Sequence, residues 1–220
     1  IKSYILGSIM GHLLYQRNVL AIHGGSVVID NKAVIIVGES GSGKSTVTTA
    51  LRLKGYKLLT DDIASVSMDK EVFVNPGYPG QRLCDNVMNY FNYDLDKYRR
   101  IDLNHKVKYM IPTWEEFAYE KTNLGTICEL KAAEVDEPFI EEIKGRDKVN
   151  LLYDNGYILR WVRHLGMKPD YVRQCVQVAK QVKMYRITRP KTGFTVGEQV
   201  ELLESILFKA KSEELKYIIA

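Results

Sequence analysis

The sequence has 220 residues, of which 45% are hydrophobic and 26% charged, and its formal net charge is +4. That length is enough for one sizeable α/β core, the charge is too weak to indicate nucleic-acid binding, and no apolar run reaches the roughly 18 residues of a membrane span. We therefore expect a single domain over residues 1–220 that binds neither nucleic acid nor a membrane. Because the sequence begins with Ile1 and not Met, we expect it to be part of a longer chain.

The cysteines indicate a compartment. Cys84, Cys128 and Cys175 are widely spaced and odd in number. They form neither a disulfide framework nor a Cys-x-x-Cys metal pair, so we predict a reducing, cytoplasmic location.

Hydrophobic periodicity and turn residues predict the elements of the first half of the chain. In order, they are a helix at Ser3–Gln16, strands at Leu20–Ile29 and Ala33–Val37 around a turn at Asp30–Lys32, a helix at Lys44–Lys54 ended by Gly55, a short strand at Tyr56–Leu59, and a hairpin of Ile63–Ser67 with Glu71–Val74.

The second half begins with Asn75–Arg82, which contains two prolines and two glycines and is predicted to be a loop bordering the active site. The region Cys84–Tyr119 has a mixed pattern that predicts short helices and a strand near Lys106–Ile111. The remaining predicted elements are strands at Gly125–Ala132, Pro138–Ile143 and Met184–Thr188, and helices at Arg146–Tyr153, Pro169–Val182 and Val196–Lys211.

The segment Gly38–Ser45 fits the phosphate-binding pattern G-x-x-x-x-G-K-[ST] at every position. Its glycines allow successive backbone N–H groups to point at phosphate oxygens, and the helix beginning at Lys44 adds the positive end of its dipole. Lys44 supplies a charge for the outer phosphates, and the Ser45 hydroxyl is a potential Mg²⁺ ligand. The predicted nucleotide-binding residues are Gly38, Glu39, Ser40, Gly41, Ser42, Gly43, Lys44, Ser45 and Thr46.

The loop alone does not separate a kinase from an ATPase, a GTPase or a transporter motor, but Asp61 and Asp62 narrow the choice. They follow a predicted strand, one β-α-β unit after the loop. Transfer of a phosphoryl group to a hydroxyl needs one carboxylate to orient or accept the hydroxyl proton and an acidic group to hold the metal. Two adjacent carboxylates at a strand end fit both roles, and a surface turn is the alternative.

His23 lies in a predicted strand, fifteen residues before Gly38. A histidine in an apolar strand is commonly a buried, hydrogen-bonded core residue. The next strand, however, leads directly into the loop and would bring His23 alongside the phosphate site. Both interpretations stay open on this basis.

These features in this order resemble the HPr kinase/phosphorylase family and its HPr-kinase-like relatives. The residues that carry the resemblance are His23-Gly24, the loop GESGSGKS at Gly38–Ser45, and GYKLLTDD at Gly55–Asp62. Looser matches lie at Asn75–Leu83, Cys128–Pro138 and Tyr185–Pro190.

The resemblance implies the core shared with PEP carboxykinases, an α/β fold with a mixed sheet and flanking helices. It also implies a kinase that uses ATP and Mg²⁺ to phosphorylate a serine hydroxyl. Among the site residues, it implies Asp62 as the base, Asp61 with Ser45 at the metal, and His23 supporting the acidic pair. Arg82 is a candidate for stabilising transition-state charge, with a solvated loop arginine as the alternative.

Two departures from the family pattern favour its stand-alone branch. HPr kinases usually have Glu directly after the loop's Lys-Ser, where this chain has Thr46, and their downstream glycine-rich signature has no counterpart between Lys106 and Leu130. Some members of that branch phosphorylate serine on ribosomally made precursor peptides, including lasso peptides. A peptide or small protein is therefore the expected acceptor, and the resemblance leaves a homo-oligomer open.

Two other functions remain open from the sequence. One is HPr(Ser) kinase/phosphorylase activity. The other is a nucleotide-binding sensor or switch without transfer activity, for which the missing carboxylate at Thr46 is the main support.

Overall fold

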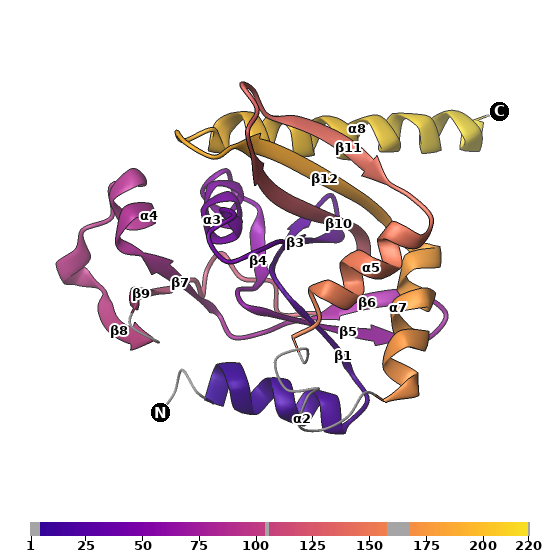
Figure 1. The fold of residues 1–220 in the computed structure, drawn as a ribbon, viewed down its shortest axis with the longest axis horizontal. Helices are drawn as coiled ribbons and strands as arrows, with labels where there is room; N and C mark the ends of the chain where they lie inside the picture. The colour runs from indigo at the N-terminus through magenta and orange to yellow at the C-terminus, as the bar shows by residue number, and fades with distance from the viewer. Residues whose placement is uncertain (1–4, 104–105, 158–167, 220) are drawn as a thin grey trace.

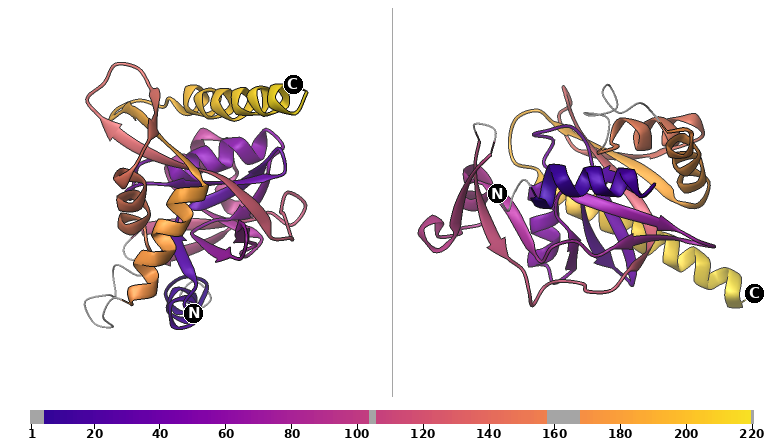
Figure 2. Two further views of the ribbon diagram at one scale, coloured as in Figure 1. Left: turned by 90° about the vertical axis from the view of Figure 1, so that its right-hand side faces the viewer. Right: turned by 90° about the horizontal axis from the view of Figure 1, so that it is seen from below.

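The structure, a computed structural model, describes residues 5–103, 106–157 and 168–219. Two groups of helices cover the two faces of a mixed sheet, and a small separate sheet stands to one side (Figures 1 and 2). The fold class is therefore α/β with a mixed sheet and flanking helices, as expected.

The described helices are η1 (Ile5–Ile9, a π-helix), α2 (Met10–Gln16), α3 (Lys44–Leu53), α4 (Asp85–Tyr90), η2 (Leu95–Lys97, a 3-10 helix), α5 (Arg146–Asp154), α7 (Pro169–Gln181) and α8 (Val196–Ile219). The described strands are β1 (Leu20–His23), β2 (Gly25–Ile29), β3 (Lys32–Val37), β4 (Lys57–Thr60), β5 (Ile63–Met68), β6 (Val72–Asn75), β7 (Gly80–Cys84), β8 (Arg99–Leu103), β9 (Lys106–Pro112), β10 (Thr122–Ala133), β11 (Phe139–Ile143) and β12 (Lys183–Pro190).

Nine of the described strands form the main sheet, in the order β1-β5-β6-β10-β3-β2-β4, with β12 and β11 continuing from β10. β10 runs parallel to β3 and to β12, and the other neighbours are antiparallel. The second sheet is antiparallel, in the order β7-β9-β8.

Strand β3 shows why the sheet is covered on both faces. Every residue after Lys32 is buried, as expected of a central strand. Ala33, Ile35 and Val37 belong to the core that includes residues of α5 and α7. Val34 and Ile36 belong to the core that includes residues of α3 and α8. Because successive side chains point to opposite faces, this one strand joins both cores, and α3 and α8 lie opposite α5 and α7 (Figure 1).

Most predicted elements are confirmed to within a few residues, but the predicted strand Leu20–Ile29 is not continuous. It divides at Gly24 into β1 and β2, which pair with different strands. A Cβ at Gly24 would lie 2.4 Å from the carbonyl oxygen of Ile36, so only glycine permits this close backbone approach.

Two further boundaries differ from the prediction. The turn at Asp30–Lys32 needs only Asp30 and Asn31, which both have positive φ, as a two-residue type I′ turn requires, and Lys32 belongs to β3. The predicted loop Asn75–Arg82 ends at Pro79, because the next residues form β7 paired with β9. The mixed region that follows contains α4, η2 and β8 before the predicted strand β9, and the last helix extends to Ile219. The helix predicted from Ser3 begins outside the described residues.

Candidate active site

The phosphate-loop segment and the acidic pair leave the main sheet at the same edge. Strand β2 lies between β3 and β4 and is antiparallel to both. In the register, Gly25 of β2 faces Ile36, near the end of β3, and Ser26 faces Thr60, the last residue of β4. The loop after β3 and the aspartates after β4 therefore emerge about 10 Å apart, two strand spacings. His23 and Gly24, just before β2, lie between them.

The flanks of Gly38–Ser45 are those predicted, since β3 ends at Val37 and α3 begins at Lys44. Gly38 has a φ of +135°, and a Cβ there would lie 2.4 Å from the carbonyl oxygen of Leu130. The loop's first turn therefore depends on glycine. The backbone N–H of Gly38 donates to Oδ1 of Asn155 (3.1 Å), which fixes the start of the loop against the end of α5.

The outer side of the loop is held by Arg189 at the end of β12. Its Nε donates to the carbonyl oxygen of Ser42 (2.9 Å) and its Nη2 to that of Gly41 (3.1 Å). Since these two carbonyls face the guanidinium, Arg189 restrains the peptide planes of the loop. Lys44 donates through Nζ to the carbonyl oxygens of Gly38 (2.7 Å) and Glu39 (2.9 Å), so its charge stays over the loop.

Arg82 on β7 binds both aspartates. Its backbone N–H and its Nε donate to Oδ2 of Asp61 (3.1 and 3.3 Å), and its Nη2 lies 2.9 Å from Oδ2 of Asp62. The Arg82 side chain is only 11% exposed. It therefore lies in a strand and in an ion-pair network, and the alternative of a solvated loop arginine is wrong.

The pKa values of the two aspartates shift in opposite directions. Burial raises the pKa of Asp61, against the lowering effect of Arg82 and Lys108. Burial would also raise the pKa of Asp62, but Arg82, His23 and Lys108 together outweigh it and the pKa falls below its ordinary value. Burial likewise opposes the charge of Arg82, yet the two carboxylates raise its pKa. Asp62, at 27% side-chain exposure, is thus the more accessible and the more firmly ionised carboxylate.

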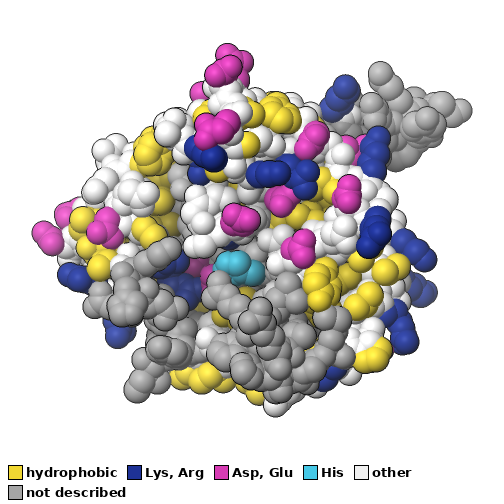
Figure 3. Space-filling model, in the orientation of Figure 1, with side chains coloured by type: hydrophobic (Ala, Val, Ile, Leu, Met, Phe, Trp, Pro, Cys, Tyr) yellow, Lys and Arg dark blue, Asp and Glu magenta, His cyan; other side chains and the backbone are white. Residues whose placement is uncertain are grey.

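His23 lies beside the acidic pair. Its Nδ1 is 3.7 Å from Oδ1 of Asp62, and its backbone N–H donates to the carbonyl oxygen of Asn155 (2.7 Å). Asn155 therefore contacts both the histidine segment and the loop at Gly38. On the face seen in Figure 3, a histidine lies near the centre, bordered by acidic and basic side chains.

A cavity of about 220 Å³ joins these groups, and we call it the loop cavity. It brings together most of the predicted site residues: His23, Ser40, Gly41, Gly43, Lys44, Ser45, Thr46, Asp61 and Asp62. Gly38 and Glu39 line a neighbouring cavity of about 390 Å³, together with His23, Ser40 and Glu129. Ser42 is buried and lines neither cavity. Arg82 does not line the loop cavity, but it binds the two aspartates that do.

Sequence reasoning missed Lys108, Arg189 and Asn155. Lys108 lies on β9 and lines the loop cavity, where it lowers the pKa of both aspartates. Nothing local in the sequence marks it. Arg189 lies in the Tyr185–Pro190 segment that resembles the family, and this resemblance is the sequence feature that could have indicated a role for it.

The donors around the loop cavity fit a nucleoside triphosphate with Mg²⁺. The N-terminal end of the ten-residue helix α3 faces the cavity through Ser45 and Thr46, and such helix ends bind phosphate. No group of three or more His, Cys, Asp or Glu side chains able to hold a metal occurs among the described residues. Mg²⁺ needs no such cage, because it is usually held by one or two carboxylates, phosphate oxygens and water. The Ser45 hydroxyl and the Asp61 carboxylate, which both line this cavity, are groups of the kind that Mg²⁺ accepts.

No family model matches the sequence, and no curated protein matches it. Among solved structures, the chain is similar to the Hpr(Ser) kinase/phosphatase from Coxiella burnetii, with 14% sequence identity and a TM-score of 0.47 over 90% of this chain and 97% of that one. No helix in the described ranges is long and apolar enough to cross a membrane.

Proposed function

We propose that the chain is a kinase that uses ATP and Mg²⁺ to transfer the γ-phosphoryl group to a serine hydroxyl of a peptide or small protein. One observation carries the proposal. A complete phosphate-loop segment and a pair of adjacent aspartates line the same cavity of about 220 Å³, on loops that leave one edge of the sheet. A nucleotide hydrolase also needs one carboxylate for Mg²⁺, whereas transfer to a hydroxyl needs a further carboxylate that orients the hydroxyl and accepts its proton.

In this proposal, the loop holds the phosphates through its backbone N–H groups and through the start of α3. Lys44 exchanges its carbonyl partners at Gly38 and Glu39 for oxygens of the outer phosphates. Mg²⁺, when bound by Ser45 and Asp61, neutralises phosphate charge.

Asp62 orients the acceptor hydroxyl and accepts its proton, because its lowered pKa keeps it ionised and its exposure leaves it accessible. His23, 3.7 Å from Asp62, supports the ionised form. Arg82 holds both carboxylates in position, so that their geometry is set before substrate binds. Its bonds to the aspartates make it a positioning residue here, not a direct ligand of the transferred group.

The acceptor is proposed from the sequence resemblance. The stand-alone HPr-kinase-like branch includes kinases of ribosomally made precursor peptides, such as lasso peptides, and Thr46 in place of Glu agrees with that branch. HPr is the second candidate acceptor, because the sequence resemblance also includes the HPr kinase/phosphorylases. A precursor peptide is the first candidate acceptor that we propose.

The test is incubation with ATP and Mg²⁺ of two kinds of acceptor, serine-containing precursor peptides and purified HPr, followed by mass spectrometry of the products. Phosphoserine on a peptide and none on HPr is the expected result. Phosphoserine on HPr alone would favour HPr kinase activity. Tight nucleotide binding without any phosphorylated product would favour the sensor or switch function.

Replacing Arg189 by Leu removes both hydrogen bonds that restrain the loop carbonyls of Gly41 and Ser42. Charged hydrogen bonds of this kind contribute roughly 1.5–3 kcal/mol, so we expect the Kd for ATP to rise about tenfold or more. Titration with a fluorescent ATP analogue measures it. Lys191→Leu is the matched control, because exposed Lys191 pairs with Glu134 two residues beyond the loop contact. Equal affinity in both variants would show that the loop holds its shape without Arg189.

Replacing Arg82 by Met is expected to change the dependence on pH. Since Arg82 is the largest influence opposing burial at Asp62, the pKa of Asp62 rises in the variant, and the acid limb of the kcat/KM profile moves to higher pH. An exposed arginine of α7 that pairs within its own helix, Arg173→Met, is the control. An unmoved acid limb would contradict the assignment.

The same variant is expected to show an altered dependence of stability on pH. In the wild type, the pKa of Asp62 is lower in the folded than in the unfolded chain. Ionised Asp62 therefore stabilises the fold at pH values above the unfolded-state pKa, and this contribution is lost as the pH falls through the folded-state pKa. Without Arg82, the pKa of each carboxylate rises relative to the wild type, so the variant loses more stability than the wild type as the pH rises from acid to neutral. Thermal unfolding from acid to neutral pH measures the difference.

A further inference from the structure

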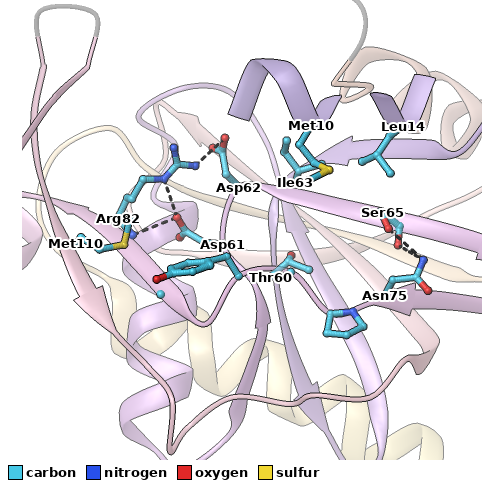
Figure 4. Close-up of a pocket in the computed structure, with 14 residues that line it drawn as sticks. Met10, Leu14, Thr60, Asp61, Asp62, Ile63, Ser65, Asn75, Arg82 and Met110 are labelled. Carbon is cyan, nitrogen blue, oxygen red and sulfur yellow. Dashed lines mark hydrogen bonds and ion pairs between the residues drawn. The ribbon is translucent and has the colours of Figure 1, made fainter. Parts of the chain in front are cut away.

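The acidic pair also borders a second cavity, which contains no residue of Gly38–Ser45. Its volume is about 300 Å³. Figure 4 shows the residues that line it. It shares Asp61 and Asp62 with the loop cavity, so the pair forms a wall between the two. Its apolar lining comes from Met10, Leu14, Ile63, Pro76, Tyr78 and Met110.

We propose that this second cavity holds an apolar side chain next to the hydroxyl-bearing residue of a peptide substrate. We call it the acceptor cavity. The inference rests on the kinase function proposed above and adds the chemistry of the substrate to it.

The geometry of phosphoryl transfer fixes the direction from which the acceptor approaches. In phosphoryl transfer the attacking and leaving oxygens lie roughly in line, so the acceptor approaches from the side opposite the nucleotide. The phosphates belong to the loop cavity with Lys44 and Ser45. A hydroxyl that comes from the acceptor cavity meets Asp62 on the shared wall.

The lining of the acceptor cavity favours an apolar side chain. Two polar residues at the far end satisfy each other, because Nδ2 of Asn75 donates to the carbonyl oxygen (3.2 Å) and to Oγ (3.0 Å) of Ser65. The remaining polar side chains are Thr60, whose hydroxyl donates to Oγ of Ser26 (3.3 Å), the hydroxyl of Tyr78, and the carboxylates with Arg82, which are already paired; the rest of the lining is apolar. An apolar side chain gains from burial there, whereas an acidic one would be placed against the carboxylate of Asp62.

Size and surroundings favour a peptide segment. The volume is at the small end of the roughly 300–1,000 Å³ of ligand pockets, which suits individual side chains and not a folded domain. Met10 and Leu14 extend from α2 towards the cavity (Figure 4). Beyond it, the same helical segment exposes Ile9 and Leu13, at 48% and 42%. As sequence neighbours of Met10 and Leu14, they offer exposed apolar side chains to further residues of a peptide.

The experiment compares serine peptides that differ only at the residues beside the serine, with leucine or aspartate there. With ATP and Mg²⁺, we expect kcat/KM to be about tenfold or more higher for the leucine peptides, the gain from burying one leucine side chain. Equal rates for the two sets would overturn the acceptor cavity and leave the kinase function intact.

The lining is tested with Leu14→Asp. We expect its KM for the leucine peptide to rise about tenfold or more and the preference for leucine over aspartate to disappear. Leu53→Asp is the control, because Leu53 is 50% exposed at the end of α3, away from the cavity. Thermal unfolding checks that both variants are folded, and Leu14→Ala, with a smaller effect in the same direction, replaces Leu14→Asp if that variant is not. A variant at Leu14 that is folded and keeps wild-type KM would overturn the proposal.

A binding measurement distinguishes failure of the kinase function from failure of the acceptor cavity. The same fluorescent leucine peptide is titrated by anisotropy in the presence of ADP. If no peptide is phosphorylated but binding is weakened by Leu14→Asp, the kinase function fails and the apolar peptide site stands. If neither phosphorylation nor binding is found, both are overturned.

Discussion

Asp62→Asn is expected to lower the rate of phosphoryl transfer by about 10²–10⁴-fold, the usual contribution of a positioned acid–base group. The amide cannot accept the acceptor's proton, although it keeps the size of the side chain and a hydrogen-bond acceptor for Arg82. Nucleotide affinity is expected to stay near the wild-type value, because in the proposed mechanism the phosphates bind Gly38–Ser45 and the start of α3, not Asp62. Initial rates with a serine peptide, together with titration of a fluorescent ATP analogue, measure both quantities.

Two further aspartate variants are compared with Asp62→Asn. Asp69→Asn changes an exposed aspartate in the turn between β5 and β6 and is expected to leave the rate unchanged. Asp61→Asn, in contrast, is expected to lose activity that high Mg²⁺ partly restores, since Asp61 is the proposed metal ligand. A fully active Asp62→Asn enzyme would show that the base is assigned to the wrong carboxylate.

Lys44→Ala is expected to lower kcat by about 10²–10³-fold, the typical effect of losing one group that stabilises transition-state charge, and also to weaken ATP binding. Its Nζ already lies over the loop, within 2.7 Å of the carbonyl oxygen of Gly38, where phosphates would bind. Substrate-saturated rates and nucleotide titration measure the two effects.

Lys54→Ala is the matched control for this variant. Lys54 is at the other end of the same helix, where its Nζ pairs with Glu204 2.7 Å away. It carries the same charge, is largely exposed and lies outside the loop cavity, so its kinetics are expected to be those of the wild type. Equal losses in the two variants would indicate that the effect comes from helix α3 and not from the phosphate site.

The loop and the aspartates could be predicted because their signals are local. The pattern Gly38–Ser45 specifies its own flanking strand and helix, and these are present as β3 and α3. The approach of Asp61 and Asp62 to the loop also follows from local order, since a strand that returns after a helix ends at the same edge. The prediction did not include β2 between the two strands, which depends on the close approach at Gly24.

The surroundings of the aspartates could not be predicted, because they depend on a different sheet. Arg82 lies in β7, whose partner β9 brings Lys108 opposite Cys84 in the antiparallel register. That register joins residues far apart in the sequence, and no local pattern encodes it. Arg189 reaches the loop from the end of β12, which depends in turn on the pairing of β12 with β10.

The fate of the γ-phosphate of labelled ATP tests the central claim most directly. Wild-type protein is incubated with Mg²⁺, ATP labelled in its γ-phosphate and a serine peptide, and the label is then traced in the peptide, in inorganic phosphate and in unreacted nucleotide. We predict that the label appears as phosphoserine in the peptide, and that Asp62→Asn prevents its appearance. Label that remained in bound ATP, or that was released only as inorganic phosphate, would contradict a kinase.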